Sequence, residues 1–287
     1  MIGNWIRNVT GHTVCGLRLM PGATSSSVYA ITLEDAAPVV LRLFTNERWL
    51  ASEPDLATHE AAALTQMEHI DLPTPQVIAL DPDGSQTDVP AVLMTLLPGT
   101  VDLRPHDPDL WLATLAEPLN VLHASPIPTF AWKYDPWIEH GLLQPPEWVG
   151  HRDLWERAFD LFVRGMPETR PCFLHRDYHP TNVLWTGGAI SGIVDWVNAC
   201  VGPPGADVAH CRLNLALMYG YETAERFLGH VDDAYDPIWD LVPALSALEG
   251  FSLYTPWADF GLQHLSEELV RERLEDFVGR SLAALGA

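Results

Sequence analysis

The spacing of apolar residues changes near residue 98, and this change limits the chain to a fold with two different halves. Before it, short apolar and β-branched runs are separated by turn-forming residues, a pattern typical of antiparallel strands. After it, four leucines between residues 112 and 122 recur at intervals of three and four, the period of an amphipathic helix. We therefore predict an α+β chain with a small antiparallel β-rich lobe over residues 1–97 and a mainly helical lobe over 98–287.

Turn and breaker residues divide the two halves into elements. In the first half we expect one helix, and Pro73 and Pro75 end it. The turn at 34–38 makes the first two strands a hairpin. The predicted strands are 28–33, 39–44, 77–80 and 91–97, and the predicted helix is 55–70. In the second half we expect a helix through 112–122, an irregular segment at 124–150, a helix at 153–166, loops with short strands at 173–196, and further helices from 207 onward.

Composition and charge narrow the class of protein. The 287 residues include 16 basic and 38 acidic side chains, so the net charge is −22. This excess disfavours nucleic acid and anionic membranes as partners, because both require a basic face. The four cysteines form no CxxC pair, and no stretch of about 18 apolar residues could span a bilayer. Since the first twenty residues also lack a signal-peptide pattern, we predict a cytoplasmic location.

The segment His175–Asn182 carries the chemistry. Asp177 and Asn182 are five residues apart, and Asp195 follows Asn182 by thirteen, at the end of an apolar run. These are the intervals of the phosphoryl-transfer site in protein-kinase-like enzymes. Such a site needs a carboxylate near the acceptor hydroxyl, and an amide oxygen and a second carboxylate that hold Mg²⁺. The spacing therefore predicts Asp177 as the catalytic base and Asn182 and Asp195 as the magnesium ligands.

Two other segments match short kinase motifs but lack the spacing of the phosphoryl-transfer site. His151–Leu154 reads His-Arg-Asp-Leu, but the residue five positions after Asp153 is Ala158, which cannot bind a metal. We interpret Asp153 as a residue of the first turn of a helix. Asp259-Phe260-Gly261 matches a kinase metal-binding triplet, but no apolar strand precedes it, and we expect a turn there.

These residues resemble the aminoglycoside phosphotransferase and choline kinase-like family, the small-molecule branch of the protein-kinase fold. The resemblance runs from about residue 10 to 250, and it implies a two-lobed kinase-like fold. The family motif HxDxxxxN is present as His175, Asp177 and Asn182, and the Asp-Trp that ends a strand as Asp195-Trp196. The acidic turn that follows in the family resembles the segment around Asp207. The resemblance implies that His175 and Asp207 support the loop, while His123, at the end of the long helix, serves as a packing residue.

Several residues of the first half resemble the family's nucleotide site. Ser25 and Ser26 lie in a segment that looks like the hairpin covering the phosphates, where small residues let backbone N–H groups approach phosphate oxygens. Met94 and Leu96 precede Pro98-Gly99 and occupy the place of the hinge strand beside the adenine. The resemblance implies ATP as the phosphate donor, with GTP not excluded.

The residue expected to bind the nucleotide phosphates differs from the one that the family commonly has. The family commonly has Lys on the third strand, but this chain has Arg42 there, and its single lysine, Lys133, lies after the long helix. Strand alternation places Arg42 on one face with Val40 and Phe44, so its charge needs a partner. Glu60 resembles the family's ion-pair carboxylate. The alternative is an arginine on an edge strand, exposed to solvent.

The resemblance implies an ATP- and Mg²⁺-dependent phosphotransferase with a small-molecule hydroxyl acceptor, for example an aminoglycoside or another antibiotic. Two alternatives stay open: a kinase of a metabolic alcohol such as choline, homoserine or a sugar, and a nucleotide-binding pseudokinase. Acidic residues of the second half are compatible with a cationic acceptor or with solvated helix faces; they are Asp232, Asp233, Asp236, Asp240, Glu249 and Asp259. His210 or Asn214 is a candidate for supporting the loop, and the oligomeric state is not predicted.

Overall fold

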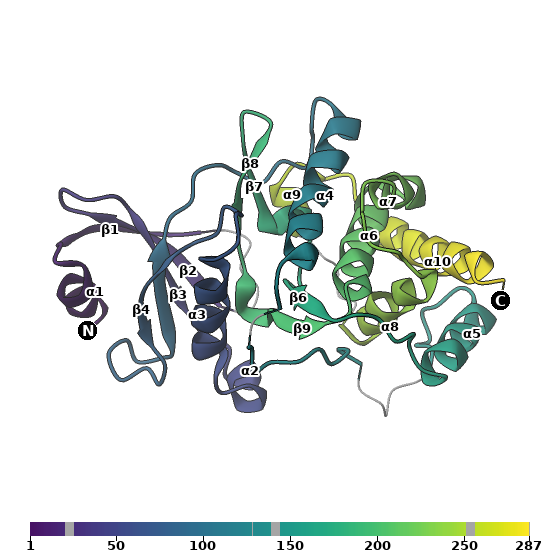
Figure 1. Cartoon of the computed structure of the whole chain (residues 1–287), viewed down its shortest axis with the longest axis horizontal. Coiled ribbons are helices and arrows are strands. Elements are labelled where there is room, and N and C mark those ends of the chain that lie inside the picture. Colours follow the sequence, from purple (N-terminus) through teal and green to yellow (C-terminus); the bar gives the residue numbers. More distant parts are fainter. Residues whose placement is uncertain (21–25, 128, 139–143, 251–255, 287) are drawn as a thin grey trace. The chain divides into compact units, whose positions relative to one another are not determined.

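The chain folds into two compact units, which are described one at a time. The structure is a computed structural model, and it describes residues 1–20, 26–127, 129–138, 144–250 and 256–286 (Figure 1). Unit 1 consists of Met1–Thr100 and Val183–Ala199, and unit 2 of Val101–Asn182 and Cys200–Ala287. No helix among the described residues combines the length and the apolar character needed to cross a bilayer.

Unit 1 contains a five-stranded antiparallel sheet. Its spatial order is β1-β2-β3-β5-β4. The strands are β1 Val14–Leu19, β2 Ser27–Leu33, β3 Val39–Leu43, β4 Val77–Asp81 and β5 Ala91–Thr95. The predicted hairpin of β2 and β3 is confirmed, with Val28 opposite Arg42. Strand β1 lies at the edge of the sheet and was not among the expected strands.

Alternation along the strands gives this sheet two different faces. Ile31, Leu41 and Leu93 share one buried face, and they pack with Trp5 and Ile6 of helix α1, Ile2–Thr10. The opposite face carries Val40 and Arg42, as period-2 alternation requires. Helix α3, Leu56–Met67, packs against β4 and β5 (Figure 1).

The expectation of a single helix in the first hundred residues was wrong. Helix α1 and the short helix α2, Glu47–Ser52, were missed, while α3 lies inside the predicted 55–70. The signal for α1 was present, because Ile2, Trp5, Ile6 and Val9 follow helical spacing. Gly11 ends α1 with φ of 79°, a conformation that glycine adopts without steric cost.

The segment 183–199 belongs to unit 1, although the sequence placed it in the second lobe. It contains β7 Val183–Thr186, β8 Ala189–Ile193 and the 3₁₀ turn η2 Trp196–Asn198. Thr100 and Trp185 exchange both backbone hydrogen bonds, at 3.1 and 2.8 Å, and the Ile193 N–H donates to the Pro73 carbonyl at 2.8 Å. These long-range backbone bonds tie the segment to the first hundred residues.

Gly99 is required where these segments meet. Its φ is 103°, and a Cβ atom there would lie 2.3 Å from Ser191 Oγ and 2.7 Å from the Trp185 carbonyl oxygen. Ser191 Oγ donates to the Pro98 carbonyl at 2.8 Å. The Pro98-Gly99 break is therefore a close backbone approach as well as the end of the strand region.

Unit 2 is mainly helical, as predicted. Its helices are α4 Pro108–Ala124, α5 Arg152–Val163, α6 Gly205–Tyr219, α7 Tyr221–Leu228, α8 Leu241–Gly250, α9 Pro256–Asp259 and α10 Glu267–Ala284, with the 3₁₀ turns η1 Pro180–Asn182 and η3 Pro237–Asp240. The four leucines of α4 are fully buried, which confirms the predicted stripe. Helix α6 is buried along most of its length and contacts α7, α8 and α10.

A two-stranded ribbon leads into the candidate site. Strand β6, Cys172–Leu174, pairs antiparallel with β9, Cys200–Gly202. His175 follows β6 directly, and α6 begins three residues after β9. The ribbon therefore places the segment from His175 to Asn182 beside the first turns of α6.

Candidate active site

The loop His175–Asn182 is held at both ends by hydrogen bonds. At its start, the backbone N–H groups of His175 and Arg176 donate to the carboxylate of Asp207, at 2.9 and 2.6 Å. At its end, the side-chain amide of Asn182 donates to the backbone carbonyl of Asp177 at 2.9 Å. Asp207 lies in the first turn of α6 and is fully buried. The conformation of the loop is therefore fixed by a buried carboxylate from a neighbouring helix.

His175 lies beneath this loop. It is fully buried, its ring stands at 77° to that of Tyr178 with centroids 5.8 Å apart, and its Nδ1 accepts from the backbone N–H of Asp177 at 3.3 Å. Tyr178 OH donates to the Leu115 carbonyl of α4 at 2.8 Å. These contacts leave the Asp177 side chain on the accessible side of the loop, where it is about one quarter exposed.

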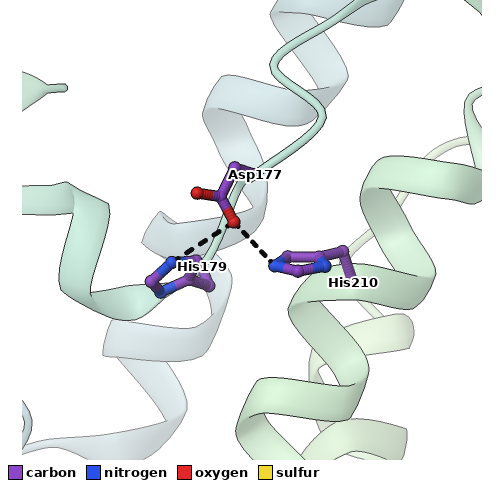
Figure 2. A group of neighbouring side chains, drawn as sticks. All are labelled: Asp177, His179 and His210. Atoms are coloured by element: carbon purple, nitrogen blue, oxygen red, sulfur yellow. Dashed lines mark ion pairs between the residues drawn. The ribbon is translucent and has the colours of Figure 1, made fainter. Parts of the chain in front are cut away.

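Two histidines contact the Asp177 carboxylate (Figure 2). Its Oδ1 atom lies 2.9 Å from His210 Nε2 and 3.6 Å from His179 Nε2. Burial acts to raise the pKa of Asp177, but His179, His210 and His175 outweigh it, and the pKa is held well below its usual range. The carboxylate is therefore ionised at neutral pH and accepts hydrogen bonds.

Of the two residues considered as loop supports, His210 contacts Asp177 directly. Asn214 lies one turn further along α6, and its amide donates to the His210 carbonyl at 3.0 Å. His210 and Asp177 are 33 residues apart in the sequence, so only the packing of α6 beside the loop brings them together.

Arg176 points into an aromatic pocket that the sequence did not predict. Its guanidinium carbon lies 4.3 Å from the ring centroid of Tyr134 and 4.2 Å from that of Trp137, and it donates to the Asp135 carbonyl. Its φ is 73°, an uncommon conformation for a residue with a side chain. The charge is thereby bound within the irregular segment 129–138, and it anchors that segment to the loop.

The predicted magnesium ligands belong to different units. In unit 2, Asn182 uses its Nδ2 atom to donate to the Asp177 carbonyl, which turns its Oδ1 atom to the opposite side. In unit 1, Asp195 follows β8 with φ of 69° and is about one third exposed. An amide oxygen and a carboxylate are donors that Mg²⁺ prefers, so the residue types present fit this ion.

Arg42 is a buried residue of a central strand, which rules out the exposed edge position. Its Nη1 atom donates to Glu60 at 2.7 Å and to Asp195 at 2.6 Å, and its Nε donates to Ser26 Oγ at 2.9 Å. Burial acts to lower the pKa of the guanidinium, but Asp195 and Glu60 outweigh it and raise the pKa above its ordinary value. Arg42 thus stays charged and joins α3 to the end of β8.

The other predicted nucleotide contacts lie in unit 1. Ser25 falls outside the described residues, while Ser26 contacts Arg42 as above. Met94 is buried on β5 opposite Val40, and Leu96 follows the end of that strand, half-buried. Their assignment to phosphate and adenine stays a prediction.

His123 forms a charged bridge beneath the loop. Its Nδ1 lies 2.7 Å from an Asp233 oxygen and its Nε2 lies 3.3 Å from an oxygen of Asp207. Burial acts to lower the pKa of His123, but hydrogen bonds to Asp207 and Asp233 outweigh it and raise the pKa to about 9 from the ordinary 6.5. The predicted packing residue is therefore also an ionic brace for Asp207.

This brace makes stability depend on pH. Because the folded-state pKa of His123 is raised, its contribution is fully present below pH 6.5 and is lost as pH rises through about 9. The two pKa values correspond to about 3 kcal/mol of unfolding free energy at most. Urea unfolding of wild type and His123→Gln from pH 6 to pH 9.5 should show a fall that the variant lacks. His230→Gln, an exposed histidine after α7, should behave as wild type; parallel curves for all three would refute the brace.

Three of the six acidic residues considered for a cationic acceptor have structural partners. Asp233 binds His123, Asp240 is fully buried against Arg212 at 3.0 Å, and Asp236 caps the backbone N–H of Ile238 at 3.0 Å. The Glu249 side chain lies outside the described residues. Half of the acidic residues considered for binding a cationic acceptor therefore already bind groups of the protein itself.

Known proteins share this fold and sequence pattern. The sequence model of the phosphotransferase enzyme family matches residues 16–249. No curated protein matches the chain. A thermostable mutant of aminoglycoside phosphotransferase APH(4)-Ia, solved as a ternary complex with ADP and hygromycin B, has 16% identity and a TM-score of 0.66, with 98% of each chain covered.

Two further solved structures have the same fold. The macrolide 2′-phosphotransferase MphH from Brachybacterium faecium has 17% identity and a TM-score of 0.53, covering 99% of this chain and 92% of that one. A mutant of aminoglycoside 2′-phosphotransferase IIIa in complex with GDP has 15% identity and a TM-score of 0.61, covering 97% and 95%. At these identities the likeness establishes a protein-kinase-like fold, and the family match covers most of the sequence. The chain therefore belongs to the phosphotransferase enzyme family.

Proposed function

We propose that this chain transfers the γ-phosphoryl group of ATP to a hydroxyl group of a small molecule. The observation that carries the proposal is the fixed loop from His175 to Asn182, which presents an ionised carboxylate at Asp177 and an amide oxygen at Asn182. Asp207 fixes the start of this loop, and the bond from Asn182 to the Asp177 carbonyl fixes its end. The membership of the chain in a phosphotransferase family supports the same reaction.

Asp177 acts on the acceptor. Its carboxylate accepts a hydrogen bond from the acceptor hydroxyl, orients the oxygen lone pair toward the γ-phosphorus and takes the proton as the new bond forms. Since the pKa of Asp177 is held low by the three histidines, the carboxylate is a weak base. Phosphoryl transfer has a loose transition state in which the proton leaves late, so orientation is the larger part of this contribution.

Asn182 Oδ1 and the Asp195 carboxylate would hold Mg²⁺. The ion, when bound, neutralises charge on the phosphate oxygens. Arg42 keeps Asp195 and Glu60 in place, and its guanidinium fork suits a phosphate oxygen as a further partner. Together these groups supply a local positive charge in a chain whose net charge is −22.

An acceptor panel tests the proposed reaction and identifies the class of acceptor. Purified chain is incubated with Mg·ATP or Mg·GTP and a panel of aminoglycosides, a macrolide, choline, homoserine and monosaccharides, and nucleoside diphosphate release is followed. We expect release above the acceptor-free rate with one class of acceptor, and with ATP as the better donor. Aminoglycosides and macrolides come first in the panel, because solved structures of the same fold are enzymes with those names.

Nucleotide binding is measured in parallel by thermal shift. Stabilisation by Mg·ATP without turnover on any acceptor would favour a nucleotide-binding pseudokinase. Absence of both stabilisation and turnover would overturn the proposal. Turnover with choline, homoserine or a sugar alone would keep the reaction and assign it to metabolism of a small alcohol.

A further inference from the structure

The carboxylate of Asp177 lies in a cluster with two imidazoles, and this cluster has a second chemical capacity. Asp177 Oδ1 and one ring nitrogen from each of His179 and His210 all lie within 4.8 Å of one another. Figure 2 shows both rings directed at the same carboxylate oxygen, one from the loop and one from α6. Asp177 and His210 are partly accessible, with side-chain exposures of 24% and 19%, while His179 is buried, so a solute reaches the cluster from the side of Asp177 and His210.

The distances approach those of a metal centre. In a tetrahedral zinc site with bonds of about 2.0–2.1 Å, two ligand atoms are about 3.3 Å apart. The separations of Asp177 Oδ1 from the two Nε2 atoms are 2.9 Å and 3.6 Å, on either side of this value. The two ring nitrogens lie within 4.8 Å of each other, so side-chain rotations that bring them closer would place all three atoms on one ion and leave a fourth position open to water.

Neighbouring groups orient these ligands. Metal-binding histidines usually donate their other ring N–H to an oxygen, which fixes the tautomer. His179 Nδ1 lies 2.8 Å from Thr181 Oγ1, so donation there leaves Nε2 with a lone pair. The Asn182 side-chain amide donates to this Nε2 at 3.2 Å, and a metal ion would take the place of that hydrogen bond. His210 is carried by the buried helix α6, and the edge of its ring faces Trp137 with centroids 6.1 Å apart.

The donor set distinguishes the cluster from the proposed magnesium ligands. Mg²⁺ prefers oxygen donors, as Asn182 and Asp195 provide, and seldom takes imidazole. Two imidazole nitrogens with one carboxylate favour the later divalent transition metals, with Zn²⁺ the type case and Co²⁺ its spectroscopic substitute. The loop from His175 to Asn182 therefore contributes donors to two proposed sites for different classes of ion: Asn182 to the magnesium site, and Asp177 and His179 to the cluster.

We propose that Asp177, His179 and His210 form a binding site for a divalent transition metal such as Zn²⁺. An ion there occupies the carboxylate oxygen that phosphoryl transfer requires, so it blocks turnover in the presence of Mg²⁺. The binding site stands on geometry alone, whereas the effect on turnover rests on the proposed function.

Binding is tested by titrating the metal-free full chain with Co²⁺ at pH 7.5. We expect one equivalent to give the intense visible absorption of four-coordinate cobalt, and Zn²⁺ but not excess Mg²⁺ to abolish it. His210→Gln keeps a donor to Asp177 but removes an imidazole, so the Co²⁺ affinity should fall at least tenfold; His179→Gln should do the same. The control His230→Gln removes an exposed histidine outside the cluster and should bind as wild type.

The outcomes separate the two proposals. Absence of the four-coordinate spectrum, or equal affinity in wild type and both cluster variants with native circular dichroism, would overturn the metal site. Displacement by Mg²⁺ at equal concentration would also overturn it, because it would indicate an oxygen-only site. Binding that leaves turnover unchanged would confirm the metal site and refute the assignment of Asp177 as the catalytic base.

Discussion

Asp177→Asn is expected to lower turnover of the acceptor by about 10²–10⁴-fold, the usual contribution of a positioned general base. The amide is nearly isosteric, and it keeps one oxygen for the hydrogen bond from His210, so the loop should retain its conformation. It cannot take the proton of the acceptor hydroxyl. Mg·ATP binding, measured by calorimetry, should stay within about threefold of wild type, because the proposed role of the carboxylate is at the acceptor.

Asp153→Asn is the matched control for this experiment. Asp153 stands in the same His-Arg-Asp sequence, but it is exposed in the first turn of α5, as the sequence predicted. Its replacement should leave both turnover and nucleotide binding unchanged. Equal activity of Asp177→Asn and wild type would refute the assignment of the base, and loss of activity in both variants would point to a shared effect on folding.

Asp207→Ala is expected to destabilise unit 2 by about 3–5 kcal/mol, as is typical when one partner of a buried ionic network is removed. The substitution leaves two buried backbone N–H groups, those of His175 and Arg176, without their acceptor. It also removes one carboxylate from the protonated ring of His123. Urea unfolding at pH 7 measures the loss, and turnover measured below the transition reports the looser loop.

Asp233→Ala separates the brace from a simple loss of charge. Asp233 also binds His123, but it is about one third exposed. Its removal should cost about 1 kcal/mol or less. Destabilisation of the same size in both variants would show that Asp207 acts only through His123, and not through the backbone of the loop.

Local patterns predicted most elements of the fold. The leucine stripe of α4 and the hairpin of β2 and β3 depend on neighbours close in sequence, so their periodicity identified them. Helix α1 was missed although its apolar spacing was visible, because a short helix that starts with the chain lacks a capping signal: Met1 makes no side-chain cap. The assignment of 183–199 to unit 1 could not be read locally, since it depends on backbone bonds to Thr100 and Pro73.

The same division applies to the candidate site. The intervals from Asp177 to Asn182 and Asp195 predict the chemical groups from sequence, because a loop of fixed length sets such intervals, and their roles stay a prediction. The partners of these groups come from distant segments: His210 and Asp207 from α6, and Arg42 from β3. Sequence suggested each of these three residues, but the pairs His210–Asp177 and Arg42–Asp195, and the aromatic pocket of Arg176, follow only from the packing of the elements.

The arginine at position 42 also has a consequence for inhibitor chemistry. A kinase lysine beside bound nucleotide carries a primary amine, and amine-reactive electrophiles can attach to it covalently. Unit 1 of this chain contains no lysine, and Arg42 remains protonated between two carboxylates. A guanidinium in that state is a very poor nucleophile, so lysine-directed warheads have no anchor in this unit. Compounds aimed at it therefore cannot gain affinity by covalent attachment to a lysine.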